Sequence, residues 1–167
     1  MTALARQSDS GEAPPLDMLM ALFEAHGWPC RMQSSDEVTG EVQGSWTKYQ
    51  LRAVSRPEDN SLQLLCLPDI RVPPVKRTVA SELLAKINEQ VWLGHFDMWA
   101  NGGMLVFRHS LLLSDDGTLS IAQAQSLVES AVEECDRFYP AFQFALWSDK
   151  SPEDALSSAL IDAMGEA

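Results

Sequence analysis

The stretch "SWTKYQLRAV" (residues 45–54) alternates two kinds of side chain along most of its length. One face carries Thr47, Tyr49, Leu51 and Ala53, and the other carries Trp46, Lys48, Gln50 and Arg52. A period of two with one apolar and one charged face is typical of an antiparallel strand that is buried on one side only. We therefore expect a sheet with one packed face and one open face.

The same alternation extends from residue 38 to about residue 67 and predicts three strands in a meander. The segment "VTGEVQ" (38–43) precedes the quoted stretch, and "SLQLLCLP" (61–68) follows it. The two connections, Gly44-Ser45 and "RPEDN" (56–60), consist of residues that turns favour. Consecutive strands with such short connections pair antiparallel.

One helix is expected before this meander and one after it. The segment "LDMLMALFEAHG" (16–27) has helical spacing and ends at Gly27, and "VPP" (72–74) separates the meander from the second helix. The predicted apolar positions are Leu16, Leu19, Met20 and Phe23 in the first helix, and Val79, Leu83, Leu84, Ile87 and Val91 in the second.

Two more helices are expected in the last third of the chain. A long helix begins at Ile121, and its predicted inward positions are Leu127, Val128, Ala131, Val132, Cys135 and Phe138. Pro140 is expected to bend or end this helix, because proline lacks an amide donor and clashes with the preceding turn. Ser151 followed by Pro152 is typical of a helix start and predicts a short final helix.

The expected elements follow the order α-β-β-β-α-β-β-α(-α). Strands in antiparallel runs, rather than single strands between helices, favour an α+β fold with a five-stranded antiparallel sheet and helices packed on one face. The 167 residues suit one domain. Residues 1–14 are small and polar and are expected to form a flexible N-terminal tail, and residues 15–167 form the single domain.

The last two strands are expected in "GHFDMWANGGMLVFRH" (94–109), which contains Asn101-Gly102 between apolar runs. This pair predicts a two-residue type I′ turn, in which both central residues have positive φ. The resulting pairs are Trp99 with Met104, Asp97 with Val106, and His95 with Arg108. Phe96, Met98, Leu105 and Phe107 then point toward the helices. A three-residue loop would shift the register by one and change these pairs.

The other face of this hairpin is the candidate site. It carries His95, Asp97, Trp99, Met104, Val106 and Arg108. Ionisable and large apolar side chains on an uncovered sheet face indicate a surface for a dimer or another protein partner. The alternative interpretation is that His95, Asp97 and Arg108 only pair across strands on a solvated face.

The net charge of −12 and the pI near 4.5 exclude the usual electrostatics of nucleic-acid or anionic-membrane binding. The charge is also uneven: seven Lys and Arg oppose four acidic residues between Trp46 and Lys86, whereas eleven acidic residues oppose two bases from Ser110 onward. One interpretation is that this layout steers self-association or the approach of a protein partner. The other, which is favoured, is that it reflects the solvated surface of acidic helices.

Three cysteines, Cys30, Cys66 and Cys135, are an odd and scattered set. Free thiols in a reducing compartment explain them better than a disulfide framework. The first residues lack the pattern of an export signal, and no apolar run is long enough for a membrane span. We therefore expect a cytoplasmic protein.

Tests for chemistry give no catalytic or cofactor motif. His95 and Asp97 share a strand face, but the nearest further histidine, His109, falls on the opposite face, so a metal site would lack a third ligand. Cys30 has Arg31 and His26 nearby but is expected to be an ordinary strand or loop residue. The expectation is a non-enzymatic protein with neither metal nor cofactor.

The segments "NEQVWLGHFD", "GGMLVFRHSLLL" and "ECDRFYPAFQFALW", with "SPEDAL" after them, resemble the YbjN family of bacterial proteins. The resemblance extends from about Leu16 to the end and implies a regulator of sensory transduction. It also implies a fold similar to that of type III secretion chaperones: helix, three strands, helix, two strands, helix. Such chaperones are acidic, cytosolic and typically dimeric, and they bind extended stretches of protein. The short C-terminal helix departs from that pattern.

The residues that match the family motif are Asn88, Gly94, His95, Phe96, Arg108, Asp136, Arg137, Phe138, Tyr139 and Pro140. The resemblance assigns no role to them, and structural roles are expected. Asn88 is expected to hydrogen-bond near the end of the second helix, and Arg137 to pair with Glu133 one turn earlier. Phe138, Tyr139 and Phe142 are expected to pack around Pro140.

The function expected from these features is a protein-interaction module, either a regulator or a chaperone-like binder of a protein partner, that forms a homodimer. The alternative is a sensor of a small molecule or metal that uses the open face of the 95–108 hairpin.

Overall fold

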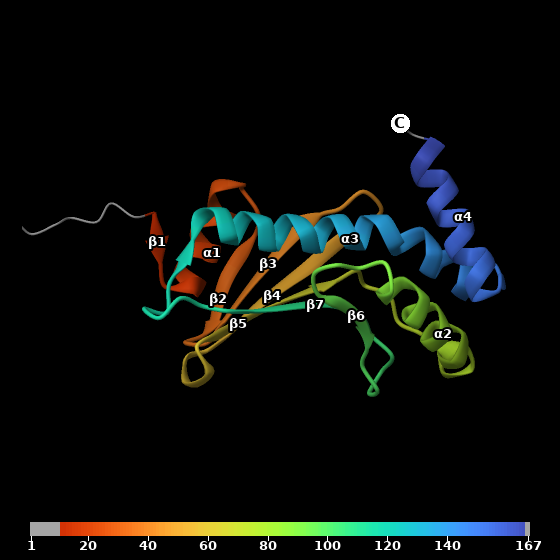
Figure 1. Ribbon diagram of the computed structural model, residues 1–167, viewed down its shortest axis with the longest axis horizontal. Helices are drawn as coiled ribbons and strands as arrows, with labels where there is room; N and C mark the ends of the chain where they lie inside the picture. The colour runs from red at the N-terminus through yellow and green to blue at the C-terminus, as the bar shows by residue number, and fades with distance from the viewer. Residues whose placement is uncertain (1–10, 166–167) are drawn as a thin grey trace, which may run out of the picture.

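The computed structural model describes residues 11–165, with side chains described as far as residue 161. An antiparallel sheet lies beneath α1 and α3, which run over the same face, while α2 and α4 lie at one end of the sheet (Figure 1). The fold is therefore α+β, as predicted, with α1 and α3 on one face of the sheet.

The helices are α1 (Pro15–Ala25), α2 (Arg77–Asn88), α3 (Ile121–Trp147) and α4 (Pro152–Gly165), with short 3₁₀ turns η1 (Pro57–Asp59) and η2 (Pro74–Lys76). The strands are β1 (Glu12–Ala13), β2 (Cys30–Ser34), β3 (Glu37–Gln43), β4 (Lys48–Arg56), β5 (Ser61–Leu67), β6 (His95–Met98), β7 (Leu105–Leu112) and β8 (Leu119–Ser120).

The main sheet has six strands in the order β2-β3-β4-β5-β7-β6, so the prediction of five was wrong. The additional strand is β2, an edge strand whose sequence "CRMQS" contains a single large hydrophobe, Met32, and shows no alternation. Its residues are exposed apart from the half-buried Cys30. An edge strand with little apolar surface gains its order from pairing with β3, and local periodicity does not report that pairing.

Part of the expected N-terminal tail is ordered. Residues 12 and 13 pair with residues 119 and 120 in a second, two-stranded sheet, and Ile121 N donates to Gly11 O at 3.2 Å. Backbone pairing thus places this part of the expected tail against the start of α3. Residues 1–10 of the predicted tail lie outside the described residues.

The core lies between the helices and one face of the sheet. Tyr49, Leu51 and Ala53 are fully buried there, as the alternation in residues 45–54 predicts. Trp46 differs from that prediction, because it lies in the turn before β4 and turns toward the helices instead of joining the charged face. Its ring stacks on Tyr139 of α3 at a centroid distance of 6.3 Å.

Pro140 lies inside α3 without ending it. A residue with an N–H at this position would donate to the carbonyl of Asp136, four residues earlier, and proline leaves that acceptor without its helical partner. The indole Nε1 of Trp46 donates to this carbonyl at 2.9 Å. A long-range contact thus takes the place of the missing helical hydrogen bond, and the helix continues to Trp147.

The last helix begins as predicted, since the Ser151 hydroxyl accepts a hydrogen bond from Asp154 N at 3.2 Å. Among residues 11–165, no helix has the length and apolar character needed to cross a membrane.

Candidate partner-binding surface

The β6–β7 hairpin has the predicted register. His95 lies opposite Arg108, Asp97 opposite Val106, and Trp99 N donates to Met104 O at 2.9 Å. The predicted two-residue type I′ turn is wrong: Gly103 N donates to Trp99 O at 3.0 Å, and Gly102 and Gly103, not Asn101, have positive φ. The loop is longer by two residues because residues 100 and 103 belong to it, but the cross-strand register of the remaining pairs is unchanged. Every side chain therefore keeps its predicted face.

The hairpin is attached to α2 by Asn88. Its side chain donates to Phe96 O at 3.0 Å and accepts from Phe96 N at 2.8 Å, as a neighbouring strand would. Phe96 packs edge-on against Phe138 of α3 at a centroid distance of 5.8 Å. The predicted bonding role of Asn88 is confirmed, and the hairpin's apolar face lies against the helices.

We call the side of the main sheet that faces away from the helices the open sheet face. It carries a second hydrophobic cluster, separate from the main core, formed by Leu65, Leu67, Val106, Trp99 and Met104. Three of these residues belong to the predicted site. Val106 is fully buried, and Trp99 and Met104 are partly exposed at the hairpin end.

Sequence reasoning missed the two β5 members of this cluster, Leu65 and Leu67. They are 7% and 8% exposed on the open sheet face. The indication was present, because "LQLLCL" is apolar on both faces, whereas a strand with one solvated face alternates.

Ion pairs surround the cluster. Arg108 Nη1 lies 3.1 Å from Asp97 Oδ2, Arg52 Nε lies 2.8 Å from Glu37 Oε1, and a third pair joins Lys48 to Glu41 at 3.1 Å. The Asp97–Arg108 pair joins diagonal neighbours across the hairpin, because the register places Val106 opposite Asp97 and His95 opposite Arg108. His95 is exposed at the start of β6. Opposite charges therefore balance locally on this face.

A shallow depression of about 600 Å³ lies beside the cluster. Met104 and Leu67 contribute its apolar lining, and Lys48, Arg52 and Asp69 its charged lining. The open sheet face thus combines an apolar strip, paired charges and a concavity, which are features of protein contact surfaces.

The turn between β3 and β4 is attached to α3 by one carboxylate. Asp136 accepts hydrogen bonds from Ser45 N at 2.8 Å, Ser45 Oγ at 2.9 Å and Tyr49 Oη at 2.5 Å. Burial, and then this hydrogen bond, raises the pKa of Tyr49 well above its ordinary value. These contacts give the "ECDRFYP" motif a structural role.

Arg137 differs from its expected pairing. Its guanidinium lies 3.7 Å from Glu134, not against Glu133, and it donates to Gln90 Oε1 at 3.3 Å. The helical spacing of Glu133 and Arg137 permits their pair, but the loop after α2 draws the guanidinium to the other side of α3. Glu133 lies on the opposite side of α3, beside a groove.

The ionisable groups considered for chemistry are dispersed. His109 lies on the helix side of β7, where burial lowers its pKa. Burial and the nearby Glu24 raise the pKa of Cys30, which disfavours the thiolate. Burial also raises the pKa of Cys135. Within residues 11–161, no three His, Cys, Asp or Glu side chains are grouped so that they could hold a metal ion.

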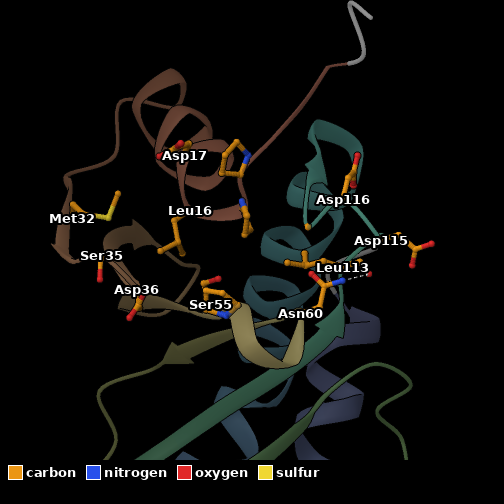
Figure 2. A pocket seen from close by; sticks show the side chains of 14 residues that line it. Leu16, Asp17, Met32, Ser35, Asp36, Ser55, Asn60, Leu113, Asp115 and Asp116 are labelled. Carbon is orange, nitrogen blue, oxygen red and sulfur yellow. Dashed lines mark hydrogen bonds between the residues drawn. The ribbon is translucent and has the colours of Figure 1, made fainter.

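Figure 2 shows a separate pocket of about 460 Å³ between the start of α1 and the loop after β7. Four carboxylates line it: Asp17 of α1, Asp36 between β2 and β3, and Asp115 and Asp116 of the loop after β7. Asn60 closes one side by donating to Ser114 O at 2.8 Å. This pocket shares no residue with the open sheet face, and its carboxylates disfavour an anionic ligand.

Comparison with known proteins identifies the family over most of the chain. Residues 15–144 match the family model YbjN, described as "Putative bacterial sensory transduction regulator". The chain belongs to the YbjN family. This confirms the resemblance drawn from the sequence motifs, and the matched region includes both the open sheet face and the Asp136 contacts.

Similarity to solved structures is found at low identity. The crystal structure of YbjN from E. coli, described as a putative transcription regulator, has a similar fold, with a TM-score of 0.50 and 17% identity, covering 72% of this chain and 85% of that one. A chain of the ExsC–ExsE complex has a TM-score of 0.47 and 12% identity, covering 73% and 88%. Among curated proteins, none matches this sequence significantly.

Proposed function

We propose that this YbjN-family chain is a non-enzymatic, cytoplasmic regulator or chaperone-like protein that binds a polypeptide through the open sheet face, and that a second copy of the chain is one such partner. The observation that carries this proposal is the hydrophobic cluster of Leu65, Leu67, Val106, Trp99 and Met104 on the sheet side opposite the helices. Leu65, Leu67 and Val106 are already nearly buried, so the surface that a partner would remove from water is that of the partly exposed Trp99 and Met104. Removal of such apolar surface from water is favourable.

The charge distribution supports a second copy as a partner. The whole chain has a net charge of −12, so two copies repel each other through most approaches. On the open sheet face, Lys48, Arg52 and Arg108 each have an acidic partner. Contact through this balanced face keeps the acidic helices of both copies apart.

The test is the molar mass in solution of the wild type and two matched variants. Met104→Glu places a carboxylate in the apolar cluster, and Ile121→Glu adds the same charge at an exposed position in the first turn of α3. We expect light scattering to give a dimer for the wild type and Ile121→Glu, and a monomer for Met104→Glu.

Partner capture from a native cell extract extends this test to other proteins. We expect polypeptides retained by the wild type and Ile121→Glu to be lost with Met104→Glu. A chain that is strictly monomeric and retains no polypeptide would overturn the proposal.

A second candidate function rests on the depression that Lys48 and Arg52 line. A small molecule or metal bound there, beside the hairpin, would make the chain a ligand-responsive sensor. Thermal-shift measurements with metals and metabolites separate the two functions. Stabilisation by one ligand that is lost in Lys48→Ala or Arg52→Ala favours the sensor, whereas stabilisation by none favours protein binding.

A further inference from the structure

A further concave surface lies on the helix side of the molecule, away from the open sheet face. It is a groove of about 310 Å³ between the end of α1, β3 and α3. Leu22, Val42 and Val128 are nearly fully buried at its floor, and Trp28 and Val132 are partly exposed along it. Apolar surface therefore remains accessible to a partner side chain.

Local structure holds the aromatic wall of this groove in place. The chain turns at Gly27, which has a φ of +70°, and Trp28 N then donates to Phe23 O at 3.0 Å. The Trp28 ring stacks on His26, with centroids 4.6 Å apart and planes inclined by 16°. The wall is thus formed before any partner arrives, which lowers the conformational cost of binding.

The rim of the groove is acidic. Glu129 and Glu133 lie one turn apart on α3, and within residues 11–161 no lysine or arginine lines the groove. Like charges at this spacing repel each other and disfavour the helix. Arg137 does not relieve them, because its guanidinium lies against Glu134 and Gln90.

We propose that this groove binds a basic amphipathic segment of a partner polypeptide, with an apolar side chain inserted between α1 and α3 and lysine or arginine side chains against Glu129 and Glu133. The unneutralised acidic rim requires a partner with basic side chains, and the apolar floor requires that the partner also has an apolar face. The net charge of −12 further attracts a basic segment. This inference concerns a different surface from the open sheet face.

The test uses the full-length, ¹⁵N-labelled chain and two synthetic probes: a helical leucine–lysine peptide and the same peptide with glutamate in place of lysine. We expect the lysine peptide to bind and to shift the amide resonances of Leu22, Val42 and Val132 and the indole resonance of Trp28. Trp28→Phe assigns that indole signal. The glutamate peptide is expected not to bind.

Paired charge reversals locate the acidic contribution. Glu129→Lys with Glu133→Lys is expected to weaken binding of the lysine peptide about tenfold, as expected for two reversed surface pairs. Glu82→Lys with Glu89→Lys changes the net charge equally at exposed positions at the other end of the molecule, within and just after α2, and is expected to leave binding nearly unchanged (Figure 1).

Equal weakening by both pairs of reversals, or resonance shifts confined to the open sheet face, would overturn the groove proposal. Neither result affects the proposed function, which depends on Met104→Glu. Loss of dimerisation in Met104→Glu, with unchanged binding of the lysine peptide, would show that the two surfaces act independently.

Discussion

At the scale of single residues, two glycines show two separate reasons for which a position requires glycine: the backbone conformation and the close approach of a neighbouring atom. Gly27 and Gly94 have φ values of +70° and +76°, where a Cβ is unfavourable. A Cβ at Gly27 would meet nothing within 4 Å, whereas a Cβ at Gly94 would lie 2.5 Å from Arg108 O. At Gly94 the hairpin backbone therefore passes too close to its neighbour for any side chain.

Replacing each glycine by alanine in turn measures these contributions. Gly27→Ala is expected to lower the free energy of unfolding by about 1 kcal/mol, the cost of the left-handed conformation alone. Gly94→Ala is expected to cost about 3 kcal/mol, because the contact with the Arg108 carbonyl adds to it. Urea unfolding followed by circular dichroism measures both, and equal costs would contradict the predicted contact.

Tyr49 makes stability depend on alkaline pH. Its pKa is raised above 10.0, so the folded chain keeps a proton that the unfolded chain releases near that pH. The stability that Tyr49 contributes is complete below about pH 10 and is lost as the pH rises further. Urea unfolding at several alkaline pH values is expected to show this decline for the wild type and a smaller decline for Tyr49→Phe. An unchanged decline would contradict the assignment.

At the scale of elements, α3 depends on a turn that lies far from it in the sequence. The Trp46 indole occupies the Asp136 carbonyl that Pro140 leaves free, and the Asp136 side chain holds Ser45 and Tyr49. The β3–β4 turn and the middle of α3 therefore stabilise each other, and the sheet is held to its longest helix at this point.

A double-mutant cycle tests this exchange of hydrogen bonds. With Pro140 present, Trp46→Phe is expected to lower the free energy of unfolding by about 2 kcal/mol, because the Asp136 carbonyl loses the indole donor while an aromatic ring remains near Tyr139. In a Pro140→Ala background the loss is expected to be about 1 kcal/mol smaller, since the alanine backbone N–H supplies the helical bond. Additive losses would show that Trp46 acts through packing alone.

At the scale of the whole molecule, charge separates two kinds of surface. The open sheet face is balanced by local ion pairs, while the groove between α1 and α3 has an acidic rim. The first suits contact between two equally charged copies, and the second suits a basic segment. The acidic composition is thus consistent with the proposed self-association through one face and with the proposed basic partner at the other.

Self-association through the balanced face is expected to tighten as salt increases. Raising the ionic strength from about 0.01 M to about 0.15 M shortens the Debye length from about 30 Å to about 8 Å, which screens repulsion between the two acidic bodies. Sedimentation velocity measures the dimer fraction at each salt concentration. Weaker association at higher salt would indicate that ion pairs between copies dominate the contact.

Side-chain spacing in the sequence determined the faces of the central strands and of the hairpin. Tyr49 and Leu51 are buried as their alternation predicts, and His95, Asp97, Val106 and Arg108 have the predicted cross-strand partners. These predictions hold because the period of a strand is local and because the longer loop leaves the cross-strand register unchanged.

Only the tertiary structure decided the features that depend on distant contacts. The edge strand β2, the burial of Leu65 and Leu67 on the open sheet face, the Trp46 bond to Asp136 and the partner of Arg137 all depend on contacts that no local pattern reports. Local pattern indicates what a segment can form, but these contacts depend on which segment lies beside it. For this chain, the sequence by itself determined the family and the faces of its strands, whereas the folded arrangement decided where apolar and acidic surface remain available to a partner.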